Sequence, residues 1–197
     1  AGGHRVAIVQ AGAVAPVVAV DAVALEEGRA VPVSESASGS RTYVSNGAET
    51  DGQDVRIVDP QTLQILPAGQ VGEIWVGGDE IAWGYWGNEA ASAATFRAVP
   101  VGDVAEAVRG SQFLRTGDLG FLQDGHLYVT GRLKDMMILR GQCHYPNDLE
   151  ASLVGAHPAI VGGAAAAFTI QDERGSEAVV LVQEVRRDSA LDAGEVE

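Results

Sequence analysis

The chain has 197 residues, of which 46% are hydrophobic and 20% charged, and its formal net charge is −14. This length and composition are typical of a globular protein with a core of its own. The excess of carboxylates disfavours nonspecific attraction to nucleic acid or to anionic lipid, so neither is expected as a partner.

The cysteine and histidine content predicts neither a disulfide framework nor a metal site. Cys143 is the single cysteine and cannot form an internal disulfide, which favours a reducing compartment and therefore a cytoplasmic location. No catalytic base pattern lies near Cys143, so a spectator thiol is favoured over a nucleophile. The four histidines are scattered without paired metal-ligand spacing, and no metal ligand is expected.

Two apolar stretches fall short of a membrane span. Residues 6–20 lack charge, but they contain Gln10 and Pro16 and are shorter than the about 20 residues of a transmembrane helix. A signal-peptide core is conceivable there, but the chain begins with Ala1 instead of methionine, so a cut from inside a longer protein is expected. Residues 159–170 are shorter still and contain two glycines, which favours a buried strand.

The first two thirds of the chain predict short strands joined by tight turns. A strand is expected around Val55 and Ile57, another over residues 71–76, and a helix over residues 88–96. The Asp-Gly pair at positions 124–125, between two apolar runs, predicts a two-residue β-hairpin. Several short strands at close spacing are typical of a small barrel or sandwich.

After Lys134 the pattern changes to that of a small α+β unit. Strands are expected over residues 136–139, 144–145, 161–170 and 178–185, with a turn at residues 172–175. A helix is expected from Pro146, with Asp148 and Glu150 in its first turn and with Leu149 and Leu153 facing one core. The change predicts two domains, residues 1–133 and 134–197.

Residues 113–150 carry the pattern that bears most directly on function. Asp118 follows a Thr-Gly turn, and a carboxylate suits two adjacent sugar hydroxyls because it offers two acceptor oxygens and no donor. Arg132 follows in the same segment, and a guanidinium suits an anionic group beside that sugar. Two interpretations are open from these residues alone: a nucleotide-ribose site beside a flexible joint, or a surface hairpin with an ordinary ion pair.

Three segments in this order resemble the adenylate-forming superfamily, and within it the fatty acyl-AMP ligases. They are GEIWV…GYW with a later Thr-Phe pair in residues 52–96, RTGDLGFL in residues 115–122, and GRLKDMMILRGQCHYPNDLE in residues 131–150. The HYPNDLE part is similar to the acyl-AMP ligases and differs from acyl-CoA synthetases. The resemblance covers roughly residues 21–185.

The resemblance implies an α+β fold, with a distorted β-barrel subdomain that ends the large AMP-binding domain and a partial small α+β lid domain after it. The implied reaction uses ATP and Mg²⁺ to convert a fatty acid to acyl-adenylate. The acyl group then passes to the phosphopantetheine thiol of an acyl carrier protein or a polyketide synthase carrier domain. Asp118 is implied to hold the ribose hydroxyls, Arg132 to approach the ribose-phosphate side, Val129 to pack against the sugar, and Lys134 to be the hinge.

The sequence contains neither a Gly-rich phosphate loop followed by lysine nor the family's late adenylation lysine. We therefore expect no catalytic residue in this chain and no activity from the chain alone. Two alternatives stay open: a fragment of an acyl-CoA synthetase, and a noncatalytic binding module derived from this fold. The aromatic residues Trp75, Trp83, Tyr85 and Trp86 favour core or interface packing over a cofactor site.

Overall fold

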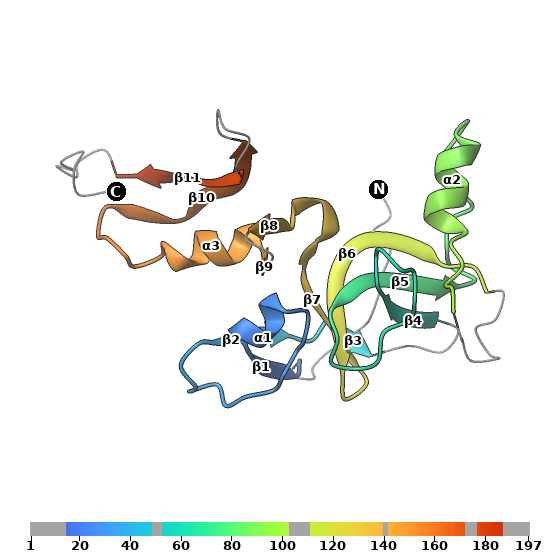
Figure 1. Ribbon diagram of the computed structural model, residues 1–197, viewed down its shortest axis with the longest axis horizontal. Helices are drawn as coiled ribbons and strands as arrows, with labels where there is room; N and C mark the ends of the chain where they lie inside the picture. The colour runs from blue at the N-terminus through green and yellow to red at the C-terminus, as the bar shows by residue number, and fades with distance from the viewer. Residues whose placement is uncertain (1–14, 49–52, 103–110, 140–141, 172–176, 187–197) are drawn as a thin grey trace. The chain divides into compact units, whose positions relative to one another are not determined.

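The computed structural model describes residues 15–48, 53–102, 111–139, 142–171 and 177–186 (Figure 1). The chain divides into two compact units, Ala1–Lys134 and Asp135–Glu197. The described residues are mostly antiparallel strands with a few short helices, which confirms the α+β class.

The main sheet of the first unit has five antiparallel strands in the order β3-β7-β6-β5-β4. Their bounds are Gly47–Ala48 for β3, Gln53–Val58 for β4, Gly72–Gly78 for β5, Leu114–Gln123 for β6 and His126–Arg132 for β7. The strands expected around Val55 and over residues 71–76 are confirmed as β4 and β5. Figure 1 shows β6 as a long, curved strand that passes along the middle of this sheet.

A two-residue turn joins β6 to β7, as the Asp-Gly pair predicted. Asp124 has φ 51° and Gly125 has φ 77°, which is the pattern of a type I′ turn. Aspartate and glycine tolerate this left-handed region better than other residues. The turn sets Gln123 opposite His126, and the pairing continues to Asp118 and Arg132 with one register shift between Leu119 and Gly120.

Apolar side chains cover both faces of the sheet. On one face Phe121 and Tyr128 stack with ring centroids 5.2 Å apart, and they pack against Val20, Leu25 and Ala30. These last residues belong to β1 (Val17–Asp21), α1 (Ala22–Glu26) and the turn after α1, and β1 pairs with β2 (Ser40–Val44). A second cluster consists of Val55, Ile57, Ile74, Val76 and Leu127. Each large side chain buried in this way contributes about 1.5–3 kcal/mol to stability.

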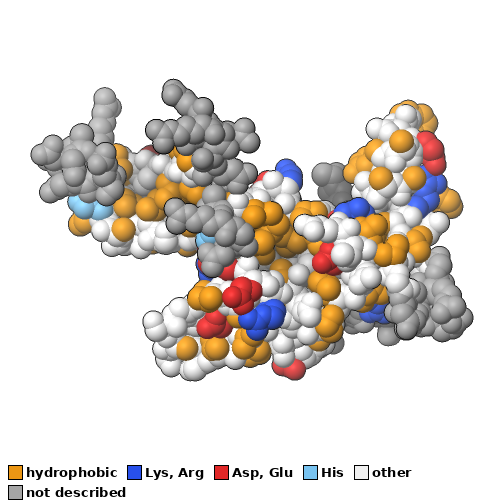
Figure 2. All heavy atoms as spheres, in the orientation of Figure 1, with side chains coloured by type: hydrophobic (Ala, Val, Ile, Leu, Met, Phe, Trp, Pro, Cys, Tyr) orange, Lys and Arg blue, Asp and Glu red, His pale blue; other side chains and the backbone are white. Residues whose placement is uncertain are grey.

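The helix expected over residues 88–96 is confirmed as α2, Glu89–Phe96. Asn88 precedes it as N-cap, and its Oδ1 accepts a hydrogen bond from the Ala91 N–H at 3.1 Å. Figure 2 shows apolar side chains at the surface over this helix.

The aromatic residues before α2 only partly follow the packing expectation. Trp75 is buried in the core, at 1% exposed. Trp83 and Trp86 are 97% and 101% exposed, so neither packs in the core, and interface packing stays a prediction for both. The reason is local: Gly84 and Gly87 adopt positive φ values, so this segment is a loop and has no alternating strand face to bury.

The second unit contains two antiparallel strand pairs and one helix. β8 (Met137–Leu139) pairs with β9 (Gln142–His144), and β10 (Ile160–Gln171) pairs with β11 (Glu177–Val185). These strands confirm the predicted ones, with small differences at their ends. The largest difference is in β9, which was predicted over residues 144–145 and ends at His144. The predicted turn at residues 172–175 lies outside the described residues.

Helix α3 (Pro146–Ser152) begins at Pro146, as predicted, with Asp148 in its first turn. Glu150 lies beyond that turn, and its Oε1 accepts a hydrogen bond from the Ala167 N–H of β10 at 3.1 Å. Its expected role at the helix N-terminus is therefore wrong, because Glu150 ties the helix to the strand beside it. Leu149 and Leu153 are half-buried.

Among the described residues, no helix has the length and apolar character that crossing a membrane requires.

Candidate nucleotide site

A β-bulge in β6 carries the three residues 116–118. The paired positions on either side of it are Glu73–Leu119 and Trp75–Arg115. Three residues of β6 therefore lie opposite the single residue Ile74. A bulge leaves backbone groups without their ladder partners and turns a side chain in a new direction. Gly117 has φ +73°, a left-handed conformation that glycine adopts without strain.

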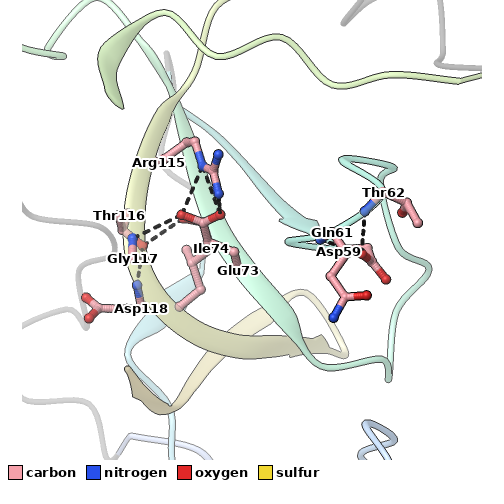
Figure 3. Close-up of polar contacts among 9 residues, drawn as sticks. All are labelled: Asp59, Gln61, Thr62, Glu73, Ile74, Arg115, Thr116, Gly117 and Asp118. Carbon is pink, nitrogen blue, oxygen red and sulfur yellow. Dashed lines mark hydrogen bonds and ion pairs between the residues drawn. The ribbon is translucent and has the colours of Figure 1, made fainter. Parts of the chain in front are cut away.

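Two side chains supply the hydrogen bonds that the sheet ladder does not (Figure 3). The Thr116 hydroxyl donates to the Ile74 carbonyl at 2.7 Å and accepts from the Asp118 N–H at 3.0 Å. The Gly117 N–H donates to Glu73 Oε1 at 3.2 Å. The shape of the bulge is thus defined by side-chain contacts on both of its sides.

Glu73 is a buried carboxylate that also binds the guanidinium of Arg115. Arg115 Nε donates to Glu73 Oε2 at 3.0 Å, and its terminal nitrogen donates to the same oxygen at 2.7 Å. The Glu73 side chain is 2% exposed and that of Arg115 is 31% exposed. The guanidinium lies over the Trp75 ring, 5.4 Å from its centroid. A buried carboxylate is tolerated only with such donors.

Asp118 and Arg132 face each other at the end of the β6–β7 hairpin. They are register partners, and Asp118 Oδ1 lies 3.2 Å from Arg132 Nε. Their side chains are 38% and 61% exposed, and an exposed pair of this kind contributes about 0–1 kcal/mol. Both groups therefore keep the capacity to bind a ligand from solvent.

The predicted charged residues line one cavity of about 450 Å³. Its lining residues are Thr116, Gly117, Asp118, Arg132, Leu133 and Lys134. Lys134 lies in the 3₁₀ helix η2 (Leu133–Asp135). The structure thus brings three of the four predicted site residues together.

Val129, the fourth predicted residue, is not among those that line this cavity. It pairs with Gly120 in the sheet, and its N–H donates to Asn46 Oδ1 at 3.3 Å. Its side chain is 36% exposed.

The sequence alone did not predict three residues that support the bulge at this site: Glu73, Arg115 and Thr116. One signal was present: Glu73 precedes the apolar run Ile74-Trp75-Val76 in a predicted buried strand. A carboxylate at such a position needs a cationic or N–H partner, and the motif RTGDLGFL offers Arg115 as a cation. The bulge itself has no sequence signal beyond Gly117, because a Thr-Gly pair is also typical of an ordinary turn.

The described residues contain no group of three histidine, cysteine, aspartate or glutamate side chains that could hold a metal ion.

Comparison with known proteins relates the chain to ligases. Residues 7–86 match the family described as AMP-binding enzyme. The chain is 42% identical over 186 residues to the medium-chain-fatty-acid–[acyl-carrier-protein] ligase JamA of Moorena producens (strain JHB). This alignment covers 92% of this chain and 30% of JamA. It is 40% identical over 187 residues to the long-chain-fatty-acid–AMP ligase FadD26 of Mycobacterium tuberculosis (strain H37Rv), covering 95% of this chain and 31% of FadD26.

A solved structure is similar as well. It comes from structural and functional studies of fatty acyl-adenylate ligases from E. coli and L. pneumophila. It matches with a TM-score of 0.67 and 27% identity, covering 88% of this chain and 28% of that chain. The chain spans about 30% of the length of the curated relatives that it matches. The chain thus belongs to the AMP-binding enzyme family, and the two relatives named above are a fatty acid–carrier protein ligase and a fatty acid–AMP ligase.

Proposed function

We propose that this chain supplies the ribose-binding edge of a fatty acyl-AMP ligase. The intact enzyme would activate a fatty acid with ATP and pass the acyl group to the phosphopantetheine thiol of a carrier protein or carrier domain. The observation that carries the proposal is the pairing of Asp118 with Arg132 at one cavity, where β6 bulges opposite Ile74. The names of the relatives support the fatty acid and the carrier protein as substrates.

Asp118 and Arg132 have complementary roles in this proposal. The two carboxylate oxygens of Asp118 would accept hydrogen bonds from the 2′- and 3′-hydroxyls of the ribose. The Arg132 guanidinium, 3.2 Å from Asp118 Oδ1, would face the phosphate side of the same sugar. Val129 would contact the sugar only where the nucleotide extends beyond the cavity that Asp118 and Arg132 line.

The reaction has two steps. In the first, a carboxylate oxygen of the fatty acid attacks the α-phosphorus of ATP, the bond to the bridging oxygen breaks, and pyrophosphate leaves. In the second, the thiolate sulfur attacks the acyl carbonyl carbon and AMP leaves. The residues of this chain hold the nucleotide still, and positioning of this kind lowers the barrier by several kcal/mol, on the order of 7–11 at most.

Mg²⁺ is expected for such a reaction, but the described residues offer no cluster of ligands for it. No step is therefore assigned to a metal held by this chain. No catalytic residue is assigned either, since the proposed contacts are to the ribose and its phosphate.

The two compact units suit the proposed domains. Residues 1–133 would be the barrel subdomain at the end of the large AMP-binding domain, and residues 134–197 the beginning of the lid. The boundary between the units follows Lys134, which lies in the short helix η2. These two facts support Lys134 as the hinge, because hinges are commonly a few residues at the ends of elements. A cytoplasmic location, expected from the single cysteine, belongs to the same proposal.

The test is fatty-acid-dependent exchange between ATP and labelled pyrophosphate, catalysed by the intact enzyme with a panel of fatty acids. Transfer to a phosphopantetheinylated carrier protein and to coenzyme A is then measured separately. Exchange followed by transfer to the carrier protein is expected. Transfer to coenzyme A instead would favour the acyl-CoA synthetase, and binding of ATP without any exchange would favour the noncatalytic module.

A further inference from the structure

Glu73 contacts the bulge that carries Asp118 without lining the cavity. Its side chain is 2% exposed, while that of Asp118 is 38% exposed. A carboxylate so deeply buried is out of reach of a nucleotide in the cavity. Its charge acts on the protein around it.

Glu73 contacts two residues of β6 that precede Asp118, the side chain of Arg115 and the backbone of Gly117. Oε1 accepts the Gly117 N–H at 3.2 Å, and Oε2 accepts both Nε and a terminal nitrogen of Arg115. Arg115 and Gly117 flank Thr116, so Glu73 closes the bulge from both of its sides (Figure 3). The guanidinium is held in addition against the Trp75 ring.

Thr116 fixes the same bulge from within. Its hydroxyl bridges the Ile74 carbonyl and the Asp118 N–H, at 2.7 and 3.0 Å. The backbone N–H groups of Gly117 and Asp118 are thus both bound to side chains. Without these bonds, the glycine at φ +73° has many other conformations open to it.

We propose that Glu73 is a positioning residue of the nucleotide site and acts with Thr116 to aim the Asp118 carboxylate at the ribose hydroxyls. The inference rests on the proposed function, because it gives Glu73 a role only if Asp118 binds ribose. It predicts that changes at Glu73 alter how the enzyme distinguishes one sugar from another.

Glu73→Gln keeps the size of the side chain and removes its charge. The new amide has one acceptor oxygen in place of two, so it cannot accept from both Arg115 and the Gly117 N–H, and one of these two contacts is lost. Thr116→Val removes the bridging hydroxyl at nearly constant shape, and Thr116→Ser restores it. The Val and Ser variants provide a test that does not depend on a buried charge and therefore remains usable if Glu73→Gln fails to fold.

The measurement compares ATP with 2′,3′-dideoxy-ATP in fatty-acid-dependent pyrophosphate exchange by the intact enzyme. The readout is the ratio of the two kcat/KM values. A variant that merely unfolds more easily loses active enzyme for both nucleotides alike, so this ratio is unchanged. A variant that aims Asp118 wrongly loses the contacts to the hydroxyls, which only ATP possesses.

The wild-type enzyme is expected to prefer ATP about tenfold or more, because two charge-assisted hydrogen bonds are lost with the dideoxy nucleotide. Asp118→Ala is expected to abolish the preference. Glu73→Gln and Thr116→Val are each expected to reduce it to about a third or less, and Thr116→Ser to keep it.

Two results would contradict the proposal in different ways. A preference that disappears in Asp118→Ala but stays intact in Glu73→Gln and Thr116→Val overturns the positioning role and leaves the ribose site standing. Equal use of both nucleotides by the wild-type enzyme overturns the ribose site itself, and with it the role of Glu73.

Discussion

Asp118 and Arg132 are register partners on β6 and β7, and the Asp118 Oδ1 atom lies 3.2 Å from Arg132 Nε. The pairing holds an acceptor and a donor group of opposite charge at one end of a hairpin, open to solvent. A nucleotide offers the matching groups in the same order, with ribose hydroxyls as donors and phosphate oxygens as acceptors.

Asp118→Ala in the intact enzyme removes both acceptors for the ribose. The expected loss in kcat/KM for ATP is on the order of 2–4 kcal/mol, because the hydroxyls of the bound sugar lose charge-assisted hydrogen bonds. Steady-state pyrophosphate exchange measures it. The matched control is Asp124→Asn, since asparagine also tolerates the φ of 51° at this turn. Equal ATP kinetics in the two variants would show that Asp118 is only a structural residue.

Lys134→Pro tests the proposed hinge. Proline disfavours the helical region for the residue before it, and Leu133 is part of the 3₁₀ helix η2. If the second domain must rotate between adenylation and transfer, this variant impairs one half-reaction more than the other. Acyl-adenylate formation and acyl transfer to carrier protein are followed separately.

Lys134→Ala is the control for the hinge variant, because it removes the ammonium and keeps the backbone freedom. It is expected to affect the two half-reactions to a similar and smaller extent. If the proline and alanine variants behave alike, the charge of Lys134 matters and the rotation does not.

Gly120→Ala is expected to destabilise the β6–β7 hairpin. A Cβ at this position would lie 2.4 Å from the Tyr128 carbonyl oxygen and 2.9 Å from Ile74 Cδ1, so the backbone of one strand has to move. The expected cost is about 1–3 kcal/mol. Urea unfolding of the purified chain, followed by circular dichroism, measures it.

Gly162→Ala is the matched control for the glycine variant. Its Cβ would meet only Val154 Cγ1 at 3.9 Å, an ordinary contact. The free energy of unfolding should change by less than about 1 kcal/mol, because alanine at this position meets no close neighbour. Comparable losses in both variants would show that the close contact with the Tyr128 carbonyl is not the cause of the loss at Gly120.

Asp59 gives the chain a pH-dependent contribution to stability. The Thr62 backbone N–H, with that of Gln61, binds Asp59 Oδ1 at 2.8 Å, and this lowers the pKa of Asp59 below its usual 3.8 in spite of partial burial. Because the pKa is lower in the folded state, the contribution is present above pH 3.8 and is lost as the pH falls through the folded pKa.

Asp59→Ala should therefore lower the free energy of unfolding by about 1 kcal/mol at pH 7, and the difference from wild type should shrink as the medium is made acidic. Asp59→Asn keeps an acceptor oxygen without the titration, so its difference from wild type should also shrink on acidification, from a smaller starting value. A constant difference for Asp59→Ala down to acidic pH would contradict the role of the charge.

Turns and helix ends could be predicted from the sequence where their backbone geometry favours one residue type. The Asp-Gly turn, the start of α3 at Pro146 and the helix after Asn88 all depend on a backbone preference of the residue itself. The exposure of Trp83 and Trp86 could not be predicted, because it depends on the glycines that keep their segment out of the sheet. Aromatic character alone carries no such information.

The ligand-binding groups of the candidate site could be predicted from the sequence, but the residues that hold those groups in place could not. Asp118 and Arg132 belong to a recognisable motif, and the hairpin brings them together. Glu73 is distant from both in sequence, and its contact to Gly117 exists only because β6 bulges opposite Ile74. A strand register interrupted in this way depends on tertiary packing, which period-two patterning does not describe.

The type I′ turn at Asp124 and Gly125 has a consequence for how this hairpin can change over time. The turn sets Gln123 opposite His126, and a register shift between Leu119 and Gly120 then brings Arg132 opposite Asp118. Adding or removing one residue at the turn would send alternate side chains to the opposite face of the sheet. The number of residues between the turn and the Asp118–Arg132 pair is therefore constrained, because it decides whether a carboxylate and a guanidinium stand opposite each other.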